Sequence, residues 1–231
     1  MLRIFYTAGV TPGKWLTRFA ERYPQIELHA ERYDADNILG LLGDDLADAV
    51  FLRFAPGQSP KDDTRHVIPL YEELEVVCAA RDHDVEYYDE SIPVAELEQY
   101  PQLDLADFPP EAGGVDAAME LVATGAFIAR MPMSLARLFG RKDVISREIA
   151  GGEPSMIGIC WPVDSPVAEA LEEFIGVVRG RGASSSRQAS VRQAQQQQSK
   201  PAARPAKRGG GPARGGTQRP RRQGKGPKKR R

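Results

Sequence analysis

Cysteine and histidine are scarce in this sequence of 231 residues, which contains two cysteines and three histidines. Cys78 and Cys160 lie in apolar runs, and His29, His66 and His83 are far apart along the chain. Zinc sites are usually built from closely spaced Cys and His ligands, so we predict no metal site and no cofactor. Thiols in apolar surroundings are typical of reduced, buried cysteines.

Long hydrophobic segments are also missing. No apolar run reaches the roughly 18 residues that a membrane-spanning helix needs. Residues 1–20 contain Arg3, Lys14 and Arg18 in place of the continuous apolar core of a signal peptide. We therefore expect a cytoplasmic protein with no membrane partner.

The common sequence motifs of catalysis are absent. The chain has no Gly-x-Ser-x-Gly nucleophile elbow, no Walker loop and no His-Glu-x-x-His zinc motif. Adjacent carboxylates occur at Asp44-Asp45 and Glu72-Glu73, but they fall at helix ends or turns, where solvated charge is the usual explanation. We predict a protein that is not an enzyme and keep catalysis as the weakest alternative.

Acidic residues stop at Glu173, although the whole chain carries 31 Lys and Arg against 32 Asp and Glu. Residues 181–231 hold 16 of the basic residues, which leaves 15 basic and all 32 acidic residues in residues 1–180. This basic tail also lacks aromatic residues, so it cannot bury enough apolar area to offset the entropy of the chain. We predict a disordered tail attached to an acidic folded body.

The positive charge of the tail predicts non-specific attraction to nucleic acid. Residues 207–210 and 213–216 resemble Arg-Gly-Gly segments, and residues 227–231 form a basic cluster. Sequence-specific reading is not expected, because no aromatic side chain can stack on bases. The alternative is a solvated tail that folds back on the acidic body.

Residues 1–70 show strands and helices in alternation. We predict strands at 2–7, 26–30 and 49–53, a helix that begins at Pro12 with Thr11 as its N-cap, and a second helix over 37–46. A βαβαβ order predicts right-handed crossovers and a parallel sheet.

The remainder of the body continues with strands over 67–70 and 73–80. After a short helix over 94–100 and a weak strand candidate at 104–110, a helix ends at Gly125 and a buried strand follows over 126–130. Pro132 then opens another helix. Strands at 144–148 and 156–161 precede an amphipathic helix over 167–178.

Two strand-to-helix turns are candidates for ligand binding. The turns Thr7–Gly13 and Gly113–Asp116 would present free backbone N–H groups to carboxylates or phosphates, although turn geometry and capping also explain their glycine and threonine. Arg53 follows the third strand and could hold a carboxylate by two hydrogen bonds, or could be an ordinary surface arginine. The loop around Pro132 lies at a strand end, where open α/β sheets place ligands.

These features together resemble the effector-binding domain of LysR-type transcriptional regulators, over roughly residues 1–179. The resemblance rests on the order and spacing of several short patterns: Arg3 to Tyr6, Trp15-Leu16-x-x-Phe19, Tyr23-Pro24, Asp48-Ala49-Val50, residues 68–73, and a helix ending in Val-Ala-x-Gly before a strand ending in x-Pro. The sequence departs from the family in its basic tail, in Arg130, and in beginning directly at the effector domain without a helix-turn-helix.

The resemblance implies an α/β fold with two lobes, like type 2 periplasmic binding proteins, and a small-molecule effector between them. It places lobe I at about residues 1–75 and 160–180, lobe II at about 76–159, and the tail at 181–231. An anionic metabolite and a homodimer are the expected partners, and a solute carrier of the same fold is the alternative function. The positions that match the family's effector contacts are Thr7, Gly9, Thr11, Arg53, Gly114, Met131 and Pro132.

A two-lobed fold needs two crossings of the chain between its lobes. We assign them to the strands over 74–80 and 156–161, which would place Cys78 and Cys160 on neighbouring strands. The helix over 167–178 would then pack on lobe I.

Overall fold

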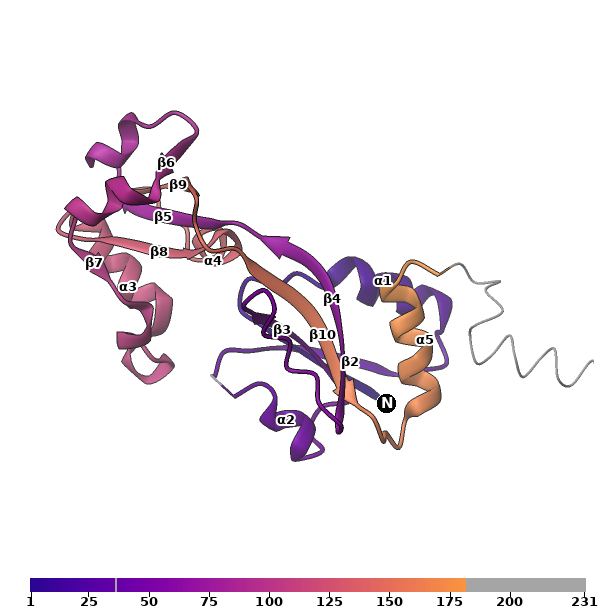
Figure 1. The fold of residues 1–231 in the computed structure, drawn as a ribbon. Helices are drawn as coiled ribbons and strands as arrows, with labels where there is room; N and C mark the ends of the chain where they lie inside the picture. The colour runs from indigo at the N-terminus through magenta and orange to yellow at the C-terminus, as the bar shows by residue number, and fades with distance from the viewer. Residues whose placement is uncertain (36, 182–231) are drawn as a thin grey trace, which may run out of the picture.

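The computed structural model describes residues 1–35 and 37–181. The predicted disordered tail lies outside the described residues, apart from Arg181. Within them the chain forms two five-stranded sheets with helices packed on them, which give the two-lobed shape seen in Figure 1. The predicted two-lobed α/β fold is confirmed.

Lobe I contains the sheet β2-β1-β3-β10-β4. Strand β1 pairs in parallel with β2 and β3, as the βαβαβ order predicts, whereas β10 runs antiparallel to both β3 and β4. The elements of this lobe are β1 (Leu2–Thr7), α1 (Gly13–Arg22), β2 (Leu28–Tyr33), α2 (Gly40–Gly43), β3 (Ala49–Phe54), β4 (Arg65–Glu73), β10 (Ser155–Pro162) and α5 (Ala168–Val178).

Aromatic side chains join helices α1 and α5 to one face of this sheet. Trp15 of α1 stacks on Phe51 of β3, with ring centroids 5.4 Å apart, and Phe19 meets Phe174 of α5 edge to face at 5.3 Å. Burying each such side chain contributes about 1.5–3 kcal/mol. The prediction that the helix over 167–178 packs on lobe I is confirmed.

Helix α2 is shorter than predicted and covers only one turn of the range 37–46. It ends at Gly43, and Asp45 then adopts a left-handed backbone conformation with φ of 54°, which no helix continues through. The predicted apolar face is nevertheless buried: Ile38, Leu41 and Leu42 pack on the opposite face of the sheet from Phe51.

Lobe II contains the sheet β6-β9-β5-β8-β7. Its core is formed by apolar side chains of β5, β8 and α3, among them Val76, Met119 and Ala129. The elements are β5 (Glu75–Ala80), β6 (Ser91–Pro93), β7 (Gln102–Leu103), α3 (Gly114–Ala123), β8 (Ile128–Pro132), α4 (Met133–Leu138) and β9 (Val144–Ala150), with 3-10 helices at Asp84–Tyr87, Val94–Gln99, Leu105–Asp107 and Pro110–Ala112.

The weak strand candidate at 104–110 is wrong. Asp104 accepts a hydrogen bond from the backbone N–H of Ala106, which opens a 3-10 turn, and Pro109 precedes a second turn. Local side-chain capping and prolines without an N–H therefore replace the sheet ladder. The helix predicted over 94–100 is likewise a 3-10 helix.

The two crossings between the lobes lie at Leu74, between β4 and β5, and at residues 151–154, between β9 and β10. The predicted return strand over 156–161 instead belongs to lobe I, where it pairs with β3 and β4. Its apolar run reflects burial at an inner position of that sheet. The predicted pairing of cysteine-bearing strands is therefore wrong, because Cys78 is in the lobe II sheet beside Ala129 and Cys160 is in the lobe I sheet beside Val50.

Candidate functional site

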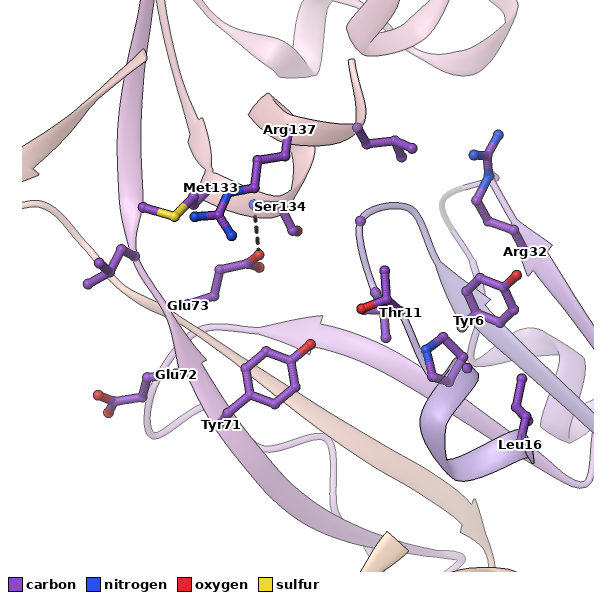
Figure 2. A pocket seen from close by; sticks show the side chains of 16 residues that line it. Tyr6, Thr11, Leu16, Arg32, Tyr71, Glu72, Glu73, Met133, Ser134 and Arg137 are labelled. Atoms are coloured by element: carbon purple, nitrogen blue, oxygen red, sulfur yellow. Dashed lines mark hydrogen bonds between the residues drawn. The ribbon is translucent and has the colours of Figure 1, made fainter. Parts of the chain in front are cut away.

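A cavity of about 960 Å³ lies between the lobes (Figure 2). Lobe I supplies the turn before α1 and parts of β1, β2 and β4, and lobe II supplies α4. The lining residues are Tyr6, Gly9, Val10, Thr11, Pro12, Gly13, Leu16, Arg32, Tyr71, Glu72, Glu73, Leu74, Met133, Ser134, Arg137 and Leu138.

The lobe I wall is the turn that leads from β1 into α1. Val10 donates a backbone hydrogen bond to the carbonyl of Thr7 at 3.2 Å, and Gly9 takes a left-handed conformation with φ of 84°. Thr11 was predicted to cap the helix, but no side chain accepts a hydrogen bond at this helix end. Its exposed side chain faces the cavity in Figure 2, beside the uncapped first turn of α1.

A network that we call the inter-lobe junction, formed by Arg53, Glu73 and Ser134, joins this wall to lobe II. Arg53 on β3 donates from Nε to Glu73 Oε2 at 2.9 Å and from Nη2 to Ser134 Oγ at 2.9 Å. Glu73 Oε1 accepts the backbone N–H of Ser134 at 2.9 Å, which is drawn in Figure 2. Both lobes thus meet through hydrogen bonds to charged groups, which are stronger than neutral ones.

A second ion pair lies on the other side of the Leu74 crossing. Arg130 of β8 contacts Glu75 with Nη2–Oε2 at 2.8 Å, and the same Glu75 oxygen accepts the backbone N–H of Glu153 at 2.8 Å. Glu75 therefore ties β8 to the segment that returns to lobe I. This contact explains an arginine at a strand position where the LysR resemblance implies an apolar residue.

The predicted site residues divide into three groups. Gly9 and Thr11 line the cavity, and Arg53 borders it through Ser134 and through a 3.3 Å hydrogen bond to the carbonyl of Ala8. The others lie outside its lining: Thr7 within the turn, Pro132 immediately before α4, Met131 in the lobe II core at 1% exposure, and Gly114 at the start of α3.

The turn that faces Thr7–Gly13 is therefore the one before α4, and not Gly113–Asp116. Sequence reasoning did not single out Ser134, Arg137 or Tyr71 as site residues. The pattern Pro132-Met133-Ser134, a strand end followed at once by a helix, offered the same signal as the first turn and could have identified Ser134.

The cavity combines apolar surface with positive charge. Tyr71 and Leu138 are 41% and 42% exposed and contribute apolar surface, to which Leu16 and Leu74 add. Burial of part of its surface raises the pKa of Tyr71, so its hydroxyl is a neutral hydrogen-bond donor at physiological pH. Arg32 and Arg137 bring positive charge to the rim.

The cysteines take no part in this site. Burial raises the pKa of Cys78 to about 12 and that of Cys160 to about 11, and both thiols are free. Each thiol stays protonated near neutral pH, and the thiolate is the reactive form. Over residues 1–35 and 37–181, no group of three or more His, Cys, Asp or Glu side chains could hold a metal ion, and no helix is long and apolar enough to cross a membrane.

Solved structures that share this fold include regulatory proteins. A mutant of the OxyR regulatory domain from Pseudomonas aeruginosa is 17% identical, with a TM-score of 0.60 over 77% of this chain and 95% of that one. CbnR, a LysR family transcriptional regulator, is 18% identical, with a TM-score of 0.59 over 77% of this chain and 68% of that one. An OxyR mutant from Corynebacterium glutamicum is 20% identical, with a TM-score of 0.60 over 84% and 67%.

The search of curated proteins returned no match to this chain. The family model of the LysR substrate binding domain matches residues 4–109, which run from β1 through the crossing at Leu74 into lobe II. Residues 4–109 therefore match the LysR substrate binding domain in sequence, and the described body shares the two-lobed fold of the solved LysR-type regulatory domains.

Proposed function

We propose that the domain senses a small anionic effector in the cavity between its lobes and acts in transcriptional regulation. The observation that carries this proposal is the lining of the cavity by both lobes. Its volume of about 960 Å³ lies within the usual range of small-molecule sites. A ligand that contacts both lobes binds one lobe arrangement better than others, and such differential affinity is what shifts a conformational equilibrium.

The chemistry of the walls supports an anion that carries an apolar part. Arg137 supplies positive charge, the first turn of α1 supplies backbone N–H groups, and Thr11 supplies a hydroxyl. Tyr71 and Leu138 offer apolar surface for the rest of the ligand. The buried, protonated cysteines do not support sensing by thiol oxidation, although OxyR has been solved in oxidised, reduced and H2O2-bound forms.

A thermal-shift screen with carboxylate and phosphate metabolites tests this function. A ligand present at 100 times its Kd and bound only to the folded state adds about 2.7 kcal/mol. For a domain of this size, that corresponds to a rise in Tm of roughly 5–10 °C. The variant Thr11→Trp, which places a bulky ring at the cavity wall, is the control and is expected to lose the shift. A screen without stabilising compounds, or shifts unchanged in this variant, would contradict the proposal.

We further propose that residues 182–231 contact nucleic acid without sequence preference. The support is their charge: the basic residues after Arg181 have no acidic residue among them. The domain alone, as an acidic body, should repel a polyanion. A cytoplasmic location is part of this proposal. The alternative function, a solute carrier, does not require a contact with nucleic acid.

Binding of the full chain to duplex DNA is expected to weaken about 10³-fold or more between 50 and 200 mM salt, if six or more phosphates are contacted. The measurement is fluorescence anisotropy with two DNA duplexes of unrelated sequence. A chain that ends at Arg181 is the control and should not bind. Salt-insensitive binding, or equal binding by the shortened chain, would contradict the proposed role of residues 182–231. If the full chain does not bind DNA at all, the alternative of a solute carrier is favoured.

A further inference from the structure

Arg137 on α4 lines the cavity and is close in the chain to Ser134, which forms the inter-lobe junction with Arg53 and Glu73. Both oxygens of the Glu73 carboxylate are engaged, one by Arg53 and the other by the backbone N–H of Ser134. The positive charge of Arg53 is therefore neutralised by Glu73, and Arg137 has no carboxylate partner among the residues that the structure describes.

The side chain of Arg137 forms no hydrogen bond or ion pair with another residue in the described part of the chain. Arg137 follows Ser134 by three positions on α4, so the two side chains share one face of the helix. Figure 2 shows its side chain extending from α4 along the lobe II wall, near Met133 and Ser134. Thr11 and Tyr71 of lobe I lie on the other side of the cavity.

The other charged lining residues do not compete for this role. Arg32 is paired with Asp34, with Nε–Oδ1 at 2.8 Å, so its charge is matched within lobe I. Glu72 extends in Figure 2 to the side of β4 away from Thr11, whereas Tyr71 extends toward the cavity. The unmatched charge next to the apolar wall thus comes from Arg137.

We propose that Arg137 is the specificity-determining residue of the cavity and selects a small carboxylate with an apolar body. The carboxylate binds the planar guanidinium, which presents paired donors to two oxygens. The apolar body lies against Tyr71 and Leu138, which have 41% and 42% of their surface exposed. The ligand thereby joins lobe II to lobe I. This inference rests on the proposed effector site and names the residue and chemical group that give it selectivity.

Three carboxylates and their neutral amides test this assignment on the full chain: hexanoate, phenylacetate and 3-phenylpropionate, each against its amide. Binding is followed at millimolar concentration by amide chemical shifts of the labelled protein. For wild type we expect at least one carboxylate to bind about 10-fold or more tightly than its amide, since hydrogen bonds between charged groups are stronger than those to a neutral amide. In Arg137→Gln the two affinities should become equal, and Arg137→Lys should restore part of the difference by charge alone.

The matched control is Arg18→Gln, which removes an exposed arginine of α1 that lies outside the cavity lining. It should keep the wild-type preference. Both glutamine variants should unfold at the wild-type temperature, because neither arginine contacts another described residue through an ion pair. The inference fails if Arg137→Gln keeps the carboxylate preference, if wild type prefers the amides, or if none of the six compounds binds. The thermal-shift screen tests the proposed effector site independently of Arg137, since it includes phosphates and larger anions.

Discussion

Replacing Arg53 by alanine should lower the free energy of unfolding by about 3 kcal/mol, the lower end of the cost of removing one partner from a buried ion pair. The side chains of Arg53 and Glu73 are only 17% and 7% exposed, so the carboxylate of Glu73 would be left in a poorly solvated position. The substitution also removes the hydrogen bond to Ser134 across the lobes. Urea unfolding followed by circular dichroism gives the measurement.

Arg141→Ala is the matched control, because Arg141 forms an ion pair of similar length with Asp143 but on the surface, with side chains 35% and 55% exposed. Exposed pairs are solvated and screened, so Arg141→Ala should cost far less than Arg53→Ala. The double variant Arg53→Met and Glu73→Gln should recover much of the loss, since it removes both charges and retains a hydrogen-bond acceptor for the Ser134 N–H. Equal costs for Arg53→Ala and Arg141→Ala would show that the junction does not hold the lobes.

Local patterns in the sequence were sufficient to predict most elements of the fold. The alternation over residues 2–53 predicted the parallel strands β1, β2 and β3, and the apolar face over 167–178 predicted helix α5. These features follow from periodicity and from the right-handed crossover rule, which need no knowledge of distant pairing.

The lobe crossings could not be obtained in this way. Strand β10 pairs with β3 and β4, which lie roughly one hundred residues earlier in the chain, and its apolar run fits any inner strand equally well. The same holds for the inter-lobe junction. Arg53, Glu73 and Ser134 belong to three separate patterns, and only the folded chain brings them together.

Only part of the site was predicted, because its two walls come from distant parts of the sequence. The turn before α1 was identified because glycine, threonine and proline mark a strand-to-helix turn locally. For the other wall the sequence offered two candidates, the turn before α3 and the loop around Pro132, and only the second leads into α4, which lines the cavity. The local sequence does not mark Arg137 as a site residue, because a single arginine on a short helix is usually a surface residue. Only the folded structure shows that it lines the cavity without an ion-pair partner in the described ranges.

Gly9→Ala should be among the most damaging single substitutions in the cavity wall. A Cβ at Gly9 would lie 2.2 Å from Ser134 Oγ, 3.0 Å from Ser134 Cβ and 3.1 Å from Arg53 Nη2, and the φ of 84° is unfavourable for alanine. The left-handed conformation costs about 1–2 kcal/mol, and overpacking adds about 1–3 kcal/mol. The clash falls on the inter-lobe junction, so the lobes should also move apart, which X-ray scattering would detect as a larger radius of gyration.

Gly57→Ala separates these two contributions, because Gly57 has a similar φ of 78° but no atom within 4 Å of a built Cβ. It should cost only the conformational part and leave the radius of gyration unchanged. Combining Gly9→Ala with Ser134→Ala removes the closest contact and should return part of the stability, but not all, because the Ser134 Cβ position and the left-handed backbone remain. If Gly9→Ala costs no more than Gly57→Ala, the turn before α1 does not pack against α4 in solution, and the cavity lacks the closed wall through which a ligand could link the two lobes.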